Sequence, residues 1–157
     1  MITPIKNIIE KDCHSWYMED TGMDIACPVG TSIRAVADGV LIYEEFGHTK
    51  WGTTDNVGID TAFCALLKLD VPQTINGIDY TLVWYCHMSK ENYHIIDGSI
   101  GMKVKMGQEI GKSGIGNKVP HLHFGILTNR QQADGDFMLP EDVANYMIKL
   151  IRLGKNK

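Results

Sequence analysis

The sequence predicts a mainly β fold, built on an antiparallel β-sheet core, with one α-helix near its C-terminal end. Short runs rich in β-branched and aromatic residues recur along the chain, and the turn-forming pairs Asp38-Gly39 and Asn76-Gly77 precede two of them. Near the C-terminal end, apolar residues recur at helical spacing instead. We therefore expect residues 1–157 to form a single domain, with its motif-bearing core at about 14–127.

The expected strands follow from runs of apolar residues bounded by turn signals. They cover residues 23–27, 32–37, 39–43, 57–62, 80–87 and 122–127. The Asp38-Gly39 pair lies between two apolar runs, so it predicts a hairpin joining 32–37 to 39–43. Residues 68–76 are interpreted as a loop, and the closely spaced glycines of 97–116 predict tight turns between very short strands.

The helix is expected at about 140–153. Pro140 suits a first helical position, and Glu141 and Asp142 place negative charge in the first turn. Val143, Met147 and further apolar residues follow at helical spacing. We expect this helix to pack on the sheet and assign it no catalytic role.

Composition excludes several functional classes. The net charge is −4 and the pI is about 5.8, so a nucleic-acid partner is not expected. No apolar run is long enough to span a membrane, and residues 1–10 lack the pattern of a secretory signal peptide. The four cysteines form no C-x-x-C pair, so they are expected to be small buried residues rather than zinc ligands.

Two of the six histidines, His121 and His123, are two residues apart in an expected strand. Side chains at this spacing point to the same face of a sheet, so the two imidazoles converge. One can bind a metal ion while the other addresses a water molecule or a substrate. The pair is also compatible with chance placement on a surface strand.

Two further polar residues interrupt apolar strands. Asp24 lies within Met23-Asp24-Ile25-Ala26, where a carboxylate must be paired, hydrogen-bonded or bound to a metal. A hydrogen bond to a turn is the simpler alternative. His87 ends the apolar run 83–86, and its alternative role is that of a buried, hydrogen-bonded imidazole.

Several blocks of the chain, in order, resemble segments of the M23 (LytM/lysostaphin-type) metallopeptidase family. They are Gly22-Met23-Asp24-Ile25, Pro28-Val29-Gly30-Thr31, Ala35-Val36-Ala37-Asp38-Gly39-Val40, Tyr85-Cys86-His87-Met88-Ser89, Gly107-Gln108-Glu109-Ile110-Gly111 and Pro120-His121-Leu122-His123-Phe124. The match runs from about Gly22 to Phe124. An ordered series of blocks is far more specific than any one of them.

The resemblance implies a lysostaphin-type, barrel-sandwich-like β core with a zinc ion in a groove on the sheet. Asp24 and His123 correspond to zinc ligands of the family. His121 and His87 correspond to the general base and the transition-state stabiliser beside a zinc-bound water, which acts as the nucleophile.

The chain departs from the family at the first histidine ligand, which commonly lies four residues before the aspartate. Asp20 occupies that position here. Either Asp20 replaces the histidine, or His14 is the ligand across a longer connection, or neither residue binds. We favour His14, because imidazole is the more usual third ligand beside one carboxylate.

Other candidates are less specific. Tyr85 and Asn117 are candidate substrate contacts, although packing and turn geometry explain them at least as well. His48 and His94 match no motif and are interpreted as loop residues.

The resemblance predicts a zinc-dependent endopeptidase that cuts peptidoglycan, in its stem peptide or its cross-bridge. A catalytic domain without a leader would suit a phage lysin or a virion-associated protein acting on the cell wall, with virion or lysis-system partners. The alternative is a non-catalytic peptidoglycan-binding, regulatory or virion structural module with a degenerate site. A biotinyl/lipoyl-type carrier ranks last, because it gives no reason for His121 and His123.

Overall fold

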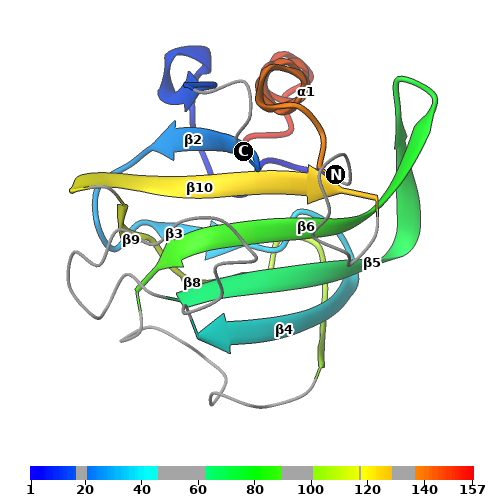
Figure 1. The fold of residues 1–157 in the computed structure, drawn as a ribbon, viewed down its shortest axis with the longest axis horizontal. Coiled ribbons are helices and arrows are strands. Elements are labelled where there is room, and N and C mark those ends of the chain that lie inside the picture. The colour runs from blue at the N-terminus through cyan, green and yellow to red at the C-terminus, as the bar shows by residue number, and fades with distance from the viewer. Residues whose placement is uncertain (17–20, 46–62, 90–100, 117, 129–136) are drawn as a thin grey trace.

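The computed structural model describes residues 1–16, 21–45, 63–89, 101–116, 118–128 and 137–157 (Figure 1). Within these ranges the chain forms one 3-10 helix, ten strands and one α-helix. They are η1 (Glu10–Asp12), β1 (Cys13–His14), β2 (Met23–Ala26), β3 (Ser32–Arg34), β4 (Gly39–Glu45), β5 (Phe63–Ile75), β6 (Ile78–Met88), β7 (Met102–Val104), β8 (Glu109–Lys112), β9 (Gly114–Gly116), β10 (Val119–Leu127) and α1 (Pro140–Arg152).

Eight of these strands form one antiparallel sheet in the order β1-β2-β10-β6-β5-β4-β7, with β9 paired to β10. Figure 1 shows β2, β10, β6, β5 and β4 side by side across the molecule. Strands β3 and β8 form a second, two-stranded sheet. In the described part of the chain the large sheet stays open rather than closing into a barrel, and the predicted antiparallel β class is confirmed.

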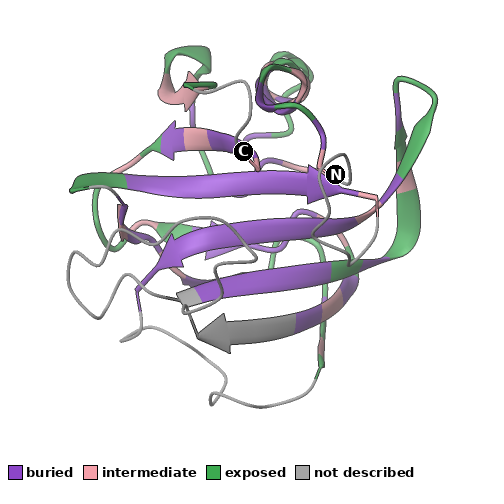
Figure 2. Cartoon of the chain, viewed as in Figure 1, coloured by how far each residue is buried: buried purple, intermediate pink, exposed green. Residues whose placement is uncertain are grey.

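Apolar side chains alternate between the two faces of the central strands β6 and β10, so each face of the sheet carries a buried apolar cluster. Val83 and Tyr85 of β6, like Leu122 and Phe124 of β10, face the main core. Their neighbours Leu82, Trp84, Cys86 and Leu127 belong to a smaller apolar cluster, so they face the opposite side of the sheet. Figure 2 shows that most of β10 and most of β6 are buried. The sheet is therefore covered on both faces near its centre.

The hairpin predicted at Asp38-Gly39 is wrong. Residues flanking Asp38-Gly39 do not form a hairpin, because β3 pairs with β8 whereas β4 pairs with β5 and β7. The Asp38 carboxylate instead accepts a hydrogen bond from the Met106 N–H at 2.8 Å. It therefore ties the crossing between the sheets to the turn before β8.

The predicted loop at 68–76 is strand for most of its length, since β5 continues to Ile75. Leu67 and Leu69 are buried while Lys68 and Asp70 are exposed, which is the alternation of a half-buried strand. The Asn76-Gly77 turn is confirmed, because both residues have positive φ angles, 53° and 79°. The predicted strand at 57–62 lies outside the described residues.

The glycine-punctuated region and the helix follow the predictions. Short strands β7, β8 and β9 lie between the turns, and α1 begins at Pro140. Val143, Met147 and Leu150 of α1 are buried in the main core. The helix contacts β1, β2 and β10, so it supports the edge of the sheet that carries His14. Within the described residues, no helix is long and apolar enough to cross a membrane.

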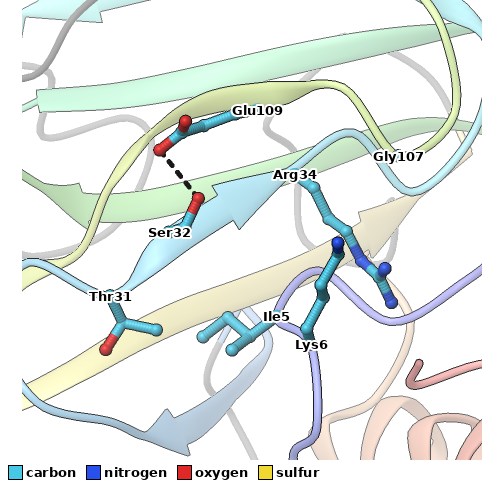
Figure 3. Close-up of a pocket in the computed structure, with 7 residues that line it drawn as sticks. All are labelled: Ile5, Lys6, Thr31, Ser32, Arg34, Gly107 and Glu109. Atoms are coloured by element: carbon cyan, nitrogen blue, oxygen red, sulfur yellow. Dashed lines mark hydrogen bonds between the residues drawn. The ribbon is translucent and has the colours of Figure 1, made fainter.

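Arg34 of β3 holds both ends of the described chain. Its buried guanidinium donates hydrogen bonds to the main-chain oxygens of Thr3 (2.8 Å), Lys157 (2.6 Å) and Lys155 (3.3 Å), and to the Thr3 hydroxyl (3.2 Å). Figure 3 shows this side chain extending from β3 toward the segment with Ile5 and Lys6. The cavity of about 360 Å³ drawn there contains none of the predicted site residues.

Replacing Arg34 with alanine should lower the free energy of unfolding by about 3 kcal/mol, because the buried Thr3 carbonyl and the partly buried oxygens of Lys155 and Lys157 lose a charged donor. Urea denaturation followed by circular dichroism measures this change. Lys105→Ala is the control: its exposed ion pair with Asp38 (3.5 Å) should contribute little to stability. Equal effects of the two substitutions would contradict the role given to Arg34.

Candidate active site

The register of three strands brings the predicted site residues together. In β10, His123 pairs with Asp24 of β2 on one side and with Cys86 of β6 on the other. His121 and His123 both face away from the side of β10 that buries Leu122 in the main core. The two imidazoles therefore lie on the same face of the sheet, as predicted.

Asp24 lies beside both imidazoles and accepts a hydrogen bond from one of them, His123. Its Oδ1 atom lies 2.8 Å from Nδ1 of His123 and 3.5 Å from Nε2 of His121. Burial raises the pKa of Asp24, but the hydrogen bond from His123 and the nearby imidazoles outweigh burial and bring that pKa below its ordinary value. The carboxylate is thus ionised at neutral pH and available as a ligand.

The tautomer of His121 follows from its hydrogen bond to a main-chain carbonyl group. Its Nδ1 atom lies 2.8 Å from the main-chain oxygen of Val119. A carbonyl oxygen only accepts, so Nδ1 carries the proton and Nε2 carries the lone pair. On the neutral ring, Nε2 is therefore the basic nitrogen, and it lies 3.5 Å from Oδ1 of Asp24.

A β-bulge turns His87 toward this pair. Ala65 pairs with Tyr85 and Phe63 pairs with Met88, so β6 has one more residue than β5 over this stretch. His87 has a φ angle of 62°, in the left-handed region that is uncommon for a residue with a side chain. Regular alternation would send His87 into the main core beside Tyr85. The bulge instead re-aims the ring toward β10.

The His87 ring is buried among the other imidazoles. Its centroid lies 4.9 Å from that of His121 and 6.0 Å from that of His123. Burial, followed by His123 and His121, lowers the pKa of His87 to about 3, although Asp24 opposes the shift. His87 is therefore neutral at pH 7. Its buried Nδ1 has no hydrogen-bond partner in the described part of the chain, an arrangement that is costly unless a ligand or water completes it.

Gly116 of β9 makes room for the two rings. A β-carbon at this position would overlap Cδ2 and Cγ of His87 and Cε1 of His121. Strand β9 pairs with β10 so that Gly114 lies opposite His121. The absence of a side chain at Gly116 is therefore a requirement of the site, because both imidazoles pack directly on the backbone there.

Thr21 is a site residue that sequence reasoning missed. Its hydroxyl oxygen lies 3.1 Å from Nε2 of His123, the nitrogen opposite the one that contacts Asp24. The approach is close because Gly22 has no side chain: a β-carbon there would overlap the backbone of Phe124. A hydroxyl three residues before Asp24 was the available signal. Such a contact orients an imidazole that serves as a ligand.

His14 lies on the other side of Asp24. It pairs with Asp24 across β1 and β2, and directly opposed residues share a face of the sheet. Its ring stacks on Trp16, with centroids 4.9 Å apart and an interplanar angle of 22°. A groove of about 460 Å³ runs over these residues; it is lined by His14, Trp16, Asp24, Ala26, Gly116, Val119, Pro120 and His121.

Asp24, His123 and His14 are residue types that bind zinc, although their side chains do not converge on a single point where an ion could sit. Among the residues that the structure describes, no three His, Cys, Asp or Glu side chains are grouped so that they could hold an ion as they stand. Asp24 Oδ1 and His123 Nδ1 already face each other, and His14 lines the same groove. One carboxylate and two imidazoles are a usual set for zinc. Asp20, the alternative ligand, lies outside the described residues.

Of the remaining predicted site residues, the structure describes Tyr85. Tyr85 is fully buried in the main core, where its hydroxyl accepts a hydrogen bond from the Val36 N–H at 3.0 Å. The expectation that Tyr85 contacts substrate is therefore wrong, because strand alternation places it on the face opposite the groove. Asn117, His48 and His94 lie outside the described residues.

No protein-family model matches the chain. The glycyl-glycine endopeptidase ALE-1 of Staphylococcus capitis is 33% identical over 110 residues, which make up 69% of this chain. The chain belongs to the M23 (LytM/lysostaphin-type) peptidase family. It spans only 24% of the length of that M23 relative.

Solved structures of M23 relatives share the fold. The catalytic domain of the antimicrobial peptidase lysostaphin from Staphylococcus simulans has a TM-score of 0.54 and 24% identity, covering 80% of this chain and 79% of that one. LytU has a TM-score of 0.51 and 23% identity, covering 88% and 81%. The lysostaphin-type fold that the resemblance implies is thus confirmed.

Replacing Gly116 with alanine should displace the rings of His87 and His121 while the sheet stays folded, since the three atoms nearest the new methyl group all belong to these two side chains. Imidazole NMR resonances measure this: those of His87 and His121 should shift, and circular dichroism should not change. Ser32→Ala, in the small sheet, is the control. Unshifted His87 and His121 resonances would show that the rings do not pack on Gly116.

Proposed function

We propose that this chain is a zinc-dependent endopeptidase that hydrolyses peptide bonds of bacterial peptidoglycan. The observation that carries the proposal is the convergence of Asp24, His123, His121 and His87 beside one groove. A carboxylate, a ligand imidazole and two further imidazoles are the parts that metal-assisted peptide hydrolysis needs. The M23 relative from Staphylococcus capitis is named a glycyl-glycine endopeptidase, so a glycyl-glycine bond is the first bond to test.

We assign the metal to Asp24, His123 and His14. Bound zinc would supply Lewis-acid chemistry, lowering the pKa of water and polarising a carbonyl group. Asp24 contributes an ionised oxygen, and His123 is held from behind by the Thr21 hydroxyl. His14 is preferred to Asp20 because it lies opposite Asp24 in the sheet and lines the groove.

His121 would act as the general base. The Val119 carbonyl keeps the proton on Nδ1, so Nε2 remains able to accept a proton within the groove. The ring is buried and packs on Gly116 and His87, which limits its rotation. A fixed base can take a proton without first reorganising its surroundings.

His87 would stabilise negative charge on the reacting carbonyl oxygen. Its low pKa keeps the ring neutral, so one ring nitrogen carries a proton to donate and the other does not. The buried setting excludes water that would compete for this donor, and a preorganised donor stabilises a developing oxyanion strongly. The unusual backbone angle at His87 is the cost of placing the ring there.

The zinc ligands can be tested by measuring zinc content and cleavage of an oligoglycine-bridged peptidoglycan on the same samples. Wild type should bind one zinc ion per chain and cleave, whereas His123→Ala and Asp24→Asn should lose both properties. His121→Ala should keep its zinc and lose about 10²-fold to 10⁴-fold in kcat, the usual contribution of a general base. Asp38→Asn, which is remote from the groove, is the matched control.

The same series decides the third ligand. We expect His14→Ala to lose zinc and Asp20→Ala to keep it; the reverse result would assign the position to Asp20. A wild-type protein that binds no zinc and cleaves no wall material would rule out the peptidase. Binding to peptidoglycan without cleavage would then identify a non-catalytic module of the same fold.

A further inference from the structure

We propose that Trp16 is a specificity-determining residue: its exposed ring forms one wall of a substrate subsite that accepts an uncharged stretch of peptide beside the bond to be cut. This inference rests on the proposed peptidase function and adds a residue to it. Trp16 lies just after β1 and lines the same groove as Asp24 and His121. It contributes neither a ligand nor a proton acceptor to the chemistry described above.

Trp16 is a candidate binding residue because of where it lies as well as because it is exposed. Single exposed apolar side chains are common on folded proteins. Trp16, however, is 65% exposed while one face of its ring is stacked on His14. Stacking fixes the plane of the indole, and the exposed remainder is available to the groove. A rigid aromatic surface of this kind binds a peptide with little loss of side-chain freedom.

Apolar side chains beside Trp16 also line the groove. Val119 is 56% exposed, and Pro120 and Ala26 are exposed as well, so two neighbouring strands add apolar surface beside Trp16. Among the described residues that line the groove, Asp24 is the one with a formally charged side chain, and its carboxylate is engaged with His123.

This lining selects against acidic side chains. A glutamate placed against Trp16, Val119 and Pro120 would meet no opposite charge among the described groove residues, and it would meet the negative face of the indole and the carboxylate of Asp24. A peptide segment with small, uncharged side chains would instead lay its backbone against the indole. The subsite should therefore favour uncharged residues next to the scissile bond and discriminate against acidic ones.

A second effect of Trp16 has to be separated from this one. Because the indole stacks on His14, its loss can also loosen a proposed zinc ligand. Loosening the ligand lowers zinc content and kcat, whereas losing the wall raises KM and weakens peptide binding. Measuring zinc, KM and kcat together distinguishes the two.

The test compares Trp16→Ala and Trp16→Phe with wild type on two peptides: an oligoglycine, and the same peptide with one glutamate beside the scissile bond. Trp16→Ala should raise KM for the oligoglycine about tenfold, equivalent to about 1.4 kcal/mol of binding. Its zinc content should be unchanged, its kcat should stay within about twofold, and its preference for the oligoglycine over the glutamate peptide should shrink. Trp16→Phe should restore most of the affinity. Val71→Ala, at a 77% exposed position in β5, is the control.

Peptide binding is also measured by calorimetry in the His121→Ala background, where cleavage does not interfere. There too, Trp16→Ala should weaken oligoglycine binding about tenfold. An unchanged KM and affinity, or a loss of zinc as the sole effect, would overturn the subsite. If wild type cleaves nothing but binds oligoglycine through Trp16, the peptidase proposal fails and the subsite stands.

Discussion

The pairing of β10 between β2 and β6 is the constraint on which the site depends. Because a strand shows alternate residues to opposite faces, the same pairing that buries Leu122 and Phe124 in the core sets His121 and His123 over the groove. A shift of one residue in register would move the apolar side chains out and the imidazoles in. The energy that holds the core together therefore also holds the site in place.

Regular strand pairing alone does not place His87 in the site; a bulge in β6 and the glycine at position 116 do so. The bulge in β6 puts Cys86 and His87 in succession outside the main core, and it requires a positive φ angle at His87. Gly116 leaves the space into which the His87 and His121 rings pack. Strained or uncommon backbone conformations often mark functional positions, because surrounding structure must maintain them. Here the closely paired strands β5, β6 and β10 provide that support.

Sequence reasoning found the parts of the site that follow from strand periodicity. His121, His123 and Asp24 were identified from spacing and from polarity within apolar runs, and the structure places them in contact. The bulge in β6 is not predictable from composition, because it depends on how β6 pairs with β5. The prediction for Tyr85 is wrong because strand alternation places its side chain in the core. The supposed Asp38-Gly39 hairpin failed for a similar reason: a turn signal does not specify which strand the chain pairs with next.

The central claim is that Asp24 and His123 form the core of a metal centre beside His121 and His87. Anomalous diffraction at the zinc edge, from crystals grown with zinc, tests it most directly. The account predicts a single peak about 2.0–2.2 Å from an Asp24 oxygen and a His123 nitrogen, with His14 as the third protein ligand. A groove without a peak, or an ion held without His123, would contradict it.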